Sequence, residues 1–212
     1  AYVVINRAQS LAYPILSSME EKNQEKTIFI SPQDALAMIT PKSMLVVVDT
    51  HSPDFVESRE LLDKVSRVVV IDHHRMMVRH IKNAVVFYHE PYASSASEMV
   101  AELVQYIGEN SLSRREAEAL LSGIMLDTKN FVLKTGVRTF EAAAYLRRRG
   151  ADTVEVKRMF ADSPEAYKAK HEIVADAEIT GNCAFACARK EFPEIRVTAA
   201  QAADELLSIQ GV

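Results

Sequence analysis

The stretch RVVVIDHHR, residues 67–75, joins a clear strand signal to a dense group of ionisable side chains. Val68–Ile71 is a run of β-branched residues, which is typical of a strand buried on both faces of a parallel sheet. The run ends directly in Asp72, His73 and His74. Two imidazoles and a carboxylate are costly to bury unless they pair or bind a metal, so helix capping alone does not explain them.

The same pattern occurs upstream. Met44–Val48 (MLVVV) is a second apolar run, also expected to be buried on both faces, and it leads into Asp49, Thr50 and His51. Ala84–Tyr88 is a third run. Because ligands bind beyond the carboxyl ends of parallel strands, we expect these polar groups to meet at one edge of the sheet. For Asp49 alone, capping of the following helix is an equally good interpretation.

Strands alternate with helical patterns, which predicts an α/β fold with a mostly parallel sheet flanked by helices. Residues 178–180 and 183–188 are expected as strands around a Gly181-Asn182 turn, which indicates the start of a second, partial α/β domain. Short apolar runs at 2–5 and 27–30 are further strand candidates. Helices are expected over residues 31–39, 53–64, 94–107, 113–126, 139–149, 152–160, 164–177 and 198–209, with 7–21 partly helical.

Composition narrows the class of protein. The 212 residues are 48% hydrophobic and 25% charged, which is typical of a globular chain and excludes disorder or coiled coil throughout. The net charge of −4 gives no general attraction for duplex nucleic acid, although a metal could still hold a nucleotide. No stretch reaches the roughly 20 apolar residues of a membrane span. Two cysteines do not make a disulfide framework, which favours a reducing compartment.

Asp127 is a third candidate ligand, because it follows the small apolar segment Gly123–Leu126. A carboxylate at a helix C-terminus is unfavourable against the helix dipole, so a ligand role is favoured over a structural one. Carboxylates with imidazoles suit Mn²⁺, Mg²⁺, Fe²⁺ or Zn²⁺. No cysteine lies near these residues in the sequence, which argues against a thiolate zinc site. The residues therefore predict metal-assisted hydrolysis of a phosphate ester or anhydride.

The chain contains, in this order, the segments VVVDTHSPDFVE, VVVIDHHR, EPYASSASEMV, SGIMLDTKNF and RTFEAAAYLRRRGAD. Together they resemble the DHH phosphoesterase superfamily, and within it the DHH domain of bacterial cyclic-di-AMP phosphodiesterases. The resemblance divides the chain into a DHH phosphoesterase domain, residues 1–176, and the beginning of a DHHA1 substrate-binding domain, residues 177–212. The second part rests on the segments AEITGNCAFACA and AAQAADELLSIQGV.

The resemblance also implies roles for individual residues. The aspartate of the DTH motif bridges two metal ions in the family, usually manganese, and here it is Asp49. By the same motifs His73 ligates one metal and Asp127 the other, and the order of the two histidines follows from the resemblance alone. His74 would lie beside the scissile phosphate, with Asp72 holding the imidazole.

The function that the resemblance implies is Mn²⁺-dependent hydrolysis of cyclic-di-AMP to linear pApA. Arg75 and Ser95 are then candidates for substrate binding. The alternatives are a DHH-family nanoRNase or phosphoadenosine phosphatase, and a non-catalytic nucleotide-binding module. The expected substrate is a cyclic dinucleotide or a short oligonucleotide rather than a duplex, and a homodimer is the expected partner state. The parent protein would be anchored in the bacterial cell membrane, with this segment on the cytoplasmic face and without membrane contact.

Two family motifs are absent from the sequence. The His-x-x-x-Asp-x-Asp segment is expected upstream of Ala1, and the Gly-Gly-Gly-His segment of DHHA1 beyond Val212. We therefore expect one incomplete metal site here, and weak or no activity from this segment alone.

Overall fold

The computed structural model describes residues 1–6, 28–108, 112–191 and 195–212. These residues form two compact units, 1–159 and 160–212, each of which is described by itself. The predicted helical character of residues 7–21 lies outside the described part of the chain. The domain boundary expected at 176/177 from the family resemblance stays a prediction, because a unit that packs together need not coincide with a family's domain.

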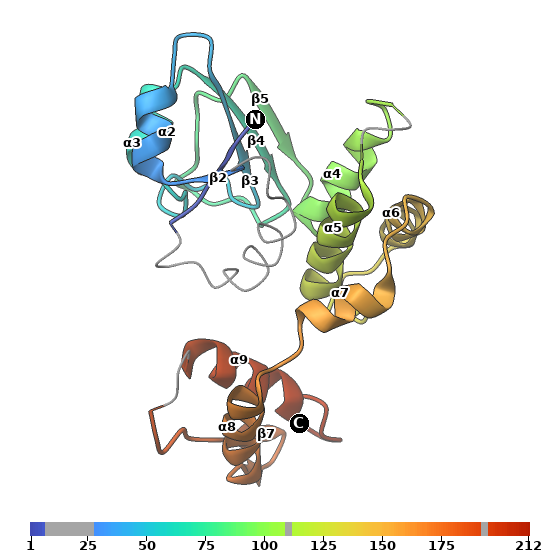
Figure 1. Ribbon diagram of the computed structural model, residues 1–212. Helices are drawn as coiled ribbons and strands as arrows, with labels where there is room; N and C mark the ends of the chain where they lie inside the picture. Colours follow the sequence, from blue (N-terminus) through green and yellow to red (C-terminus); the bar gives the residue numbers. More distant parts are fainter. Residues whose placement is uncertain (7–27, 109–111, 192–194) are drawn as a thin grey trace. The chain divides into compact units, whose positions relative to one another are not determined.

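A three-stranded parallel sheet is the centre of the first unit and confirms the predicted α/β class. Its strands are β3 (Met44–Val48), β4 (Arg67–Asp72) and β5 (Val86–His89), in the order β3-β4-β5. Helices α2 (Pro32–Met38) and α3 (Arg59–Lys64) lie together on one side of this sheet (Figure 1). Two short strands, β1 (Val3–Val4) and β2 (Phe29–Ile30), pair in parallel as a separate sheet.

The strand register aligns the polar residues at the carboxyl ends of β3, β4 and β5. Val48 of β3 pairs with Ile71 of β4, and Asp72 pairs with His89 of β5. Asp49, the first residue after β3, continues the ladder, since its N–H donates to the Ile71 carbonyl at 3.0 Å. The sheet rests on a buried cluster of aliphatic side chains, Val47, Leu62, Val68, Val70 and Ile81.

The prediction that MLVVV is buried on both faces is wrong. Met44, Val46 and Val48 are 60%, 46% and 51% exposed, whereas Val47 between them is buried. The reason is that exposed and buried residues alternate along β3, so one face of the strand packs on the aliphatic cluster and the other opens into a groove that β1 also lines. The helix expected from residue 53 also begins later, because the Ser58 hydroxyl caps α3 by accepting the Leu61 N–H at 3.2 Å.

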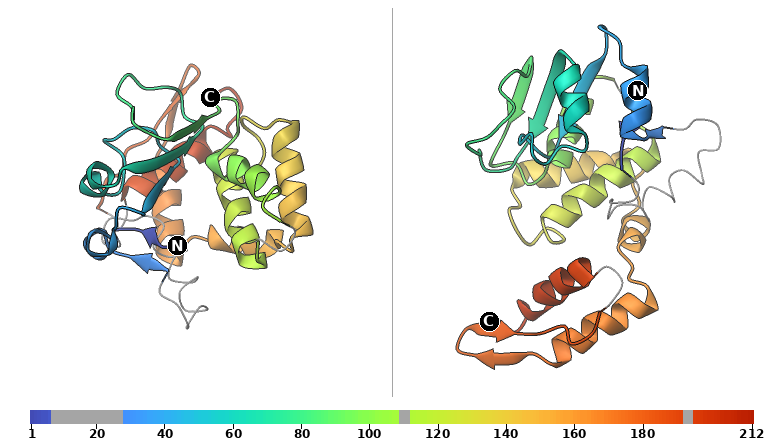
Figure 2. Two further views of the ribbon diagram at one scale, coloured as in Figure 1. Left: turned by 90° about the horizontal axis from the view of Figure 1, so that it is seen from above. Right: turned by 90° about the vertical axis from the view of Figure 1, so that its left-hand side faces the viewer.

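Four helices complete the first unit: α4 (Ala96–Val104), α5 (Arg114–Asp127), α6 (Val137–Arg148) and α7 (Thr153–Met159). Helices α4, α5 and α6 pack against one another in all three views (Figures 1 and 2). The predicted capping box of Ser113 and Glu116 opens α5. Gly123 allows close packing of α5 on α4, because a Cβ there would lie 2.9 Å from the Cβ of Ser97 and closer still to its hydroxyl.

The second unit packs α8 (Pro164–Ala175) against α9 (Ile195–Leu206). Between these helices in the sequence, β6 (Glu178–Thr180) and β7 (Cys183–Phe185) form an antiparallel hairpin, and Gly181 lies in its turn with φ +60°. Within the described ranges, no helix of either unit has the length and apolar character needed to cross a membrane.

Candidate metal site

The end of β3 places Asp49 at the edge of the sheet in an uncommon conformation. Its backbone is left-handed, with φ +62°, which aspartate tolerates better than most residues do. The side chain is 57% exposed. Backbone strain of this kind is concentrated at functional sites, and it turns the carboxylate of Asp49 toward the residues that follow β4.

His73 follows β4 and its imidazole is almost completely buried, with 5% of the side chain exposed. Nδ1 lies 3.3 Å from the carbonyl oxygen of Ala93, to which it can donate its proton. Nε2 then faces two carboxylates, at 3.4 Å from Asp49 Oδ1 and 3.4 Å from Asp127 Oδ2. No described residue forms a hydrogen bond with this buried nitrogen. A buried nitrogen without a partner, facing two carboxylates, has the donor chemistry of a divalent metal site.

Asp127 completes the cluster from the last residue of α5, so strand and helix deliver its donors to one place. Burial raises the pKa of Asp127, and the nearby charge of Asp49 raises it further. Asp49 and Asp127 in turn raise the pKa of His73, against the opposing effect of burial. Two carboxylates share one imidazole here, and a bound cation would relieve their mutual repulsion. Ligand atoms of Asp49, His73 and His74 lie within 4.8 Å of one another, and Asp127 adds a carboxylate oxygen at 3.4 Å from His73 Nε2, so these residues fit a divalent metal.

His74 has surroundings opposite to those of its neighbour. Its side chain is 54% exposed, and Nδ1 donates to Asp72 Oδ1 at 2.8 Å while lying 3.9 Å from Asp49 Oδ1. Asp72 is completely buried and also accepts the backbone N–H of His74 at 3.2 Å. Burial would raise the pKa of Asp72, but hydrogen bonds from His74 and His51 outweigh it and lower the pKa. Asp72 thus orients His74 and His51 rather than His73.

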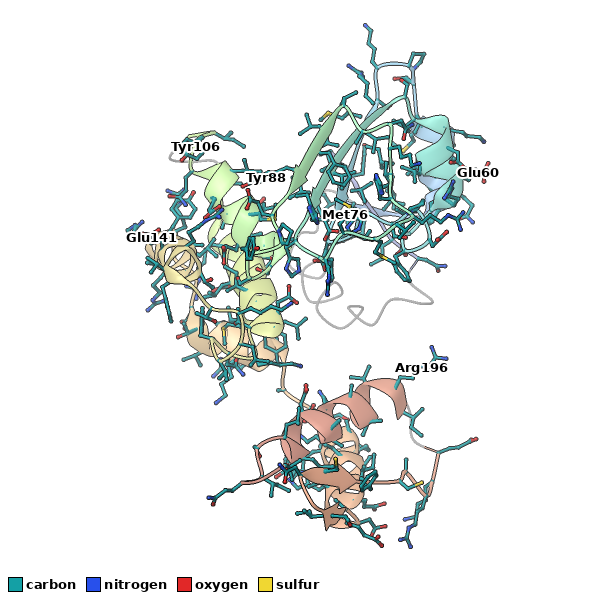
Figure 3. The ribbon with its side chains drawn as sticks, turned by 180° about the vertical axis from the view of Figure 1, so that it is seen from behind. Glu60, Met76, Tyr88, Tyr106, Glu141 and Arg196 are labelled. Carbon is teal, nitrogen blue, oxygen red and sulfur yellow. The ribbon has the colours of Figure 1, made fainter. Side chains whose placement is uncertain are left out.

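His51 is a residue of this site to which the sequence analysis gave no role. It is 1% exposed, its Nδ1 pairs with Asp72 Oδ2, and its Nε2 accepts the Met77 N–H at 2.8 Å. Because Nε2 accepts, the proton lies on Nδ1 and is donated to Asp72. The carbonyl of His51 also accepts the Ile81 N–H at 2.9 Å. His51 therefore secures the loop after β4, in which Met76 is labelled in Figure 3.

A sequence signal for His51 did exist. Asp49-x-His51 repeats the spacing of Asp72-x-His74, at the end of the neighbouring strand. A further contact comes from β5, where His89 Nε2 lies 2.6 Å from the carbonyl oxygen of His74 and can donate to it. His51, Asp72 and His89 also come within ligand distance of one another. Their nitrogens already serve these hydrogen bonds, so we interpret this second group as support for the first.

The two candidates for substrate binding differ in their exposure to solvent. Arg75 is exposed in the loop after β4. Ser95 is 1% exposed, and its hydroxyl accepts the Glu98 N–H at 3.0 Å as the N-cap of α4. The structure thus brings Asp49, Asp72, His73, His74 and Asp127 together, whereas it gives Ser95 a capping contact.

The chain is similar to several known proteins. The family model described as the DHH family, N-terminal domain, matches residues 6–124, a range that holds Asp49, Asp72, His73 and His74 and ends just before Asp127. The cyclic-di-AMP phosphodiesterase PdeA of Listeria monocytogenes is 42% identical over 216 residues, covering 100% of this chain and 33% of the relative. The cyclic-di-AMP phosphodiesterase GdpP of Bacillus subtilis is 37% identical over 217 residues, again covering 100% of this chain and 33% of the relative. The chain thus spans about a third of the length of these relatives.

Two more distant proteins are also similar. A probable manganese-dependent inorganic pyrophosphatase of Thermotoga maritima is 38% identical over 108 residues, which cover 50% of this chain and 18% of that protein. The crystal structure of an exopolyphosphatase-related protein from Bacteroides fragilis superposes with a TM-score of 0.69 at 19% identity. That match covers 95% of this chain and 67% of the other, and it supports the fold alone.

Proposed function

The chain belongs to the DHH family, and on this premise we propose that it is the metal-binding part of a phosphodiesterase that hydrolyses cyclic-di-AMP to linear pApA. The observation that carries the proposal is His73 Nε2, a buried nitrogen at 3.4 Å from Asp49 Oδ1 and from Asp127 Oδ2. The names of the relatives from Listeria monocytogenes and Bacillus subtilis support the substrate.

In this proposal Asp49, His73 and Asp127 hold a divalent metal, and manganese is favoured by the name of the Thermotoga maritima relative. When bound, such a metal would polarise a phosphoryl oxygen and lower the pKa of water. The two carboxylates would also be neutralised, which lets an anionic substrate approach a chain of net charge −4. Within the described residues these three donors are too few for two complete metal sites, which supports the expectation of weak activity from this segment alone.

The neighbouring residues would orient His74 toward the substrate. Asp72 keeps a proton on Nδ1 of His74, so its Nε2 is the atom that would exchange a proton or hydrogen bond with a phosphate oxygen. His51 gives Asp72 a second hydrogen bond and is thereby a positioning residue. The loop after β4 brings Arg75 to the same edge of the sheet, where a guanidinium could pair with phosphate.

The test is to incubate the chain with Mn²⁺ and cyclic-di-AMP and to follow linear pApA by liquid chromatography, with short oligonucleotides and phosphoadenosine phosphate as competing substrates. The proposal expects pApA that depends on Mn²⁺ and disappears in Asp49→Asn, with slow turnover. Preferred hydrolysis of phosphoadenosine phosphate or of oligonucleotides would instead identify the alternative enzymes. Nucleotide binding that is indifferent to metal and to Asp49→Asn would identify a non-catalytic module.

A further inference from the structure

A buried glutamate, Glu98, is linked to His73 through the neighbouring residues Ala93 and Ser94. Neither the residue roles that the motifs imply nor the proposed function includes it. Glu98 is in the first turn of α4 and is 2% exposed. Its Oε2 accepts two hydrogen bonds from Ser94, from the backbone N–H at 3.3 Å and from the hydroxyl at 2.5 Å. Because burying a carboxylate costs free energy, we expect Glu98 and its contacts to serve a structural or functional role.

Capping of α4 does not supply that reason. The hydroxyl of Ser95 already caps the helix by accepting the Glu98 N–H at 3.0 Å. In a capping box the third residue of the helix accepts the N–H of the cap residue itself, as Glu116 does from Ser113 at the start of α5. The carboxylate of Glu98 instead bonds to Ser94, one residue before the cap. It therefore fixes the chain that enters the helix.

The residue fixed in this way adjoins the hydrogen-bond acceptor of His73. Ala93, which precedes Ser94, is 2% exposed, and its carbonyl oxygen lies 3.3 Å from His73 Nδ1. On its other side the Ala93 N–H donates to the Glu90 carbonyl at 3.0 Å. Ala93 is thus held on one side by Glu90, which directly follows β5, and on the other, through Ser94, by Glu98 of α4.

The hydrogen bond to Ala93 decides which nitrogen of His73 is free for a ligand. A proton on Nδ1 leaves the lone pair of Nε2 between Asp49 and Asp127. A metal-ligating histidine is commonly oriented in this way by an acceptor on its second nitrogen, and loss of such an outer partner typically weakens metal binding about 10- to 100-fold.

We propose that Glu98 is a positioning residue for the metal site: by holding Ser94, it sets the Ala93 carbonyl that fixes the tautomer and direction of His73. This inference rests on the proposed metal site.

The experiment measures Mn²⁺ affinity by calorimetry in the unmodified chain and in Glu98→Gln, Glu98→Ala and Ser94→Ala. Glutamine keeps an acceptor for Ser94, so its affinity should stay within a few-fold of the original. Glu98→Ala removes both contacts with Ser94 and should bind Mn²⁺ about 10- to 100-fold more weakly. Ser94→Ala removes the hydroxyl contact and keeps the backbone N–H, so its loss of affinity should be smaller than that of Glu98→Ala. Glu116→Ala is the matched control, because it removes the corresponding glutamate of the α5 capping box and should leave the affinity unchanged.

A second measurement separates positioning from general loss of structure. Imidazole nitrogen shifts in the metal-free protein, recorded at alkaline pH, report the tautomer of His73 directly. The Nδ1–H form should dominate in the unmodified chain and in Glu98→Gln, and should fall in Glu98→Ala. An unchanged tautomer and affinity in Glu98→Ala, or an equal loss of affinity in Glu116→Ala, would overturn the inference. If the unmodified chain binds no metal, the proposed function fails, and the tautomer still tests the role of Glu98.

Discussion

Two clusters of charged side chains, one in each unit, differ in whether the basic group at the centre forms a hydrogen bond. We call a cluster complete where it does, and incomplete where no described residue forms a hydrogen bond with it. In the first unit Asp49 and Asp127 face a single imidazole, and His73 Nε2 has no hydrogen-bond partner among the described residues. In the second unit Lys170 Nζ lies 2.9 Å from Asp162 Oδ2 and 3.7 Å from Glu205 Oε2, which gives one cation two anions in ordinary contact.

Each cluster sets one basic side chain between two carboxylates, and the clusters differ in the contacts that this side chain makes. Lys170 also lies 5.5 Å above the ring of Tyr167 and donates a hydrogen bond to Asp162, so its partners account for its charge. In the other cluster His73 Nε2 has no such bond among the described residues, and burial, together with the charge of Asp49, raises the pKa of Asp127. A complete cluster stabilises its fold modestly, whereas an incomplete one is expected to take up a ligand.

The largest expected effect comes from removing the central nitrogen of the incomplete cluster. His73→Ala should lower Mn²⁺ affinity by more than the roughly 100-fold that loss of an outer partner costs, because a ligand itself is lost. In the unmodified chain, Mn²⁺ at a hundredfold excess over Kd should add about 2.7 kcal/mol to the free energy of unfolding, and in His73→Ala this gain should vanish. Thermal unfolding with and without Mn²⁺ measures both.

His171→Ala is the matched control, since His171 belongs to the second unit and lies 3.9 Å from Glu205. Its response to Mn²⁺ should equal that of the unmodified chain. Equal stabilisation of His73→Ala by Mn²⁺ would show that the two clusters do not differ in the way described.

A smaller effect should follow from moving Asp127 without altering any ligand. Gly123→Ala places a Cβ within 2.9 Å of the Cβ of Ser97 and forces α5 away from α4. Overpacking of this kind costs about 1–3 kcal/mol in the free energy of unfolding. Because Asp127 lies one helical turn beyond Gly123 on the same face, Mn²⁺ affinity should also fall. Chemical denaturation and calorimetry give the two values.

The double variant Ser97→Gly/Gly123→Ala removes the atoms that clash and should recover part of both losses. Gly136→Ser is the control for altering a glycine, since a Cβ at Gly136 meets no heavy atom within 4 Å and serine suits its N-cap position. An unchanged Mn²⁺ affinity in Gly123→Ala would mean that the packing of α5 on α4 does not set the cluster.

Only part of this fold and of the candidate metal site could be predicted from the sequence alone. The strand ends at Asp49 and Asp72 were predictable, because β-branched runs and the polar residues after them are local patterns. The exposed face of β3 was not, since it depends on which other elements cover that face of the sheet. The close packing at Gly123 and the contact of His51 with Met77 join residues far apart in sequence, and no periodicity encodes them.

The smallest expected effect lies in the complete cluster. The hydrogen bond to Asp162 raises the pKa of Lys170, burial opposes this, and the charges of Asp162 and Glu205 raise it further. A raised pKa in the folded state means that the stabilisation is fully present below the unfolded value of 10.5 and is lost as pH rises through the folded value. Lys170→Met should therefore cost about 0.5–1 kcal/mol in the free energy of unfolding at neutral pH.

Lys168→Met, an exposed lysine on the same helix, is the matched control and should cost less. Hydrogen exchange of α8 and α9 reads the stability of the second unit at pH 7, and denaturant unfolding compares neutral with strongly alkaline pH. The difference between Lys170→Met and the unmodified chain should shrink at alkaline pH, and neither protein should respond differently to Mn²⁺. If Lys170→Met altered the response to Mn²⁺, the two clusters would be coupled, and completeness within each could no longer explain why a metal is expected only in the first.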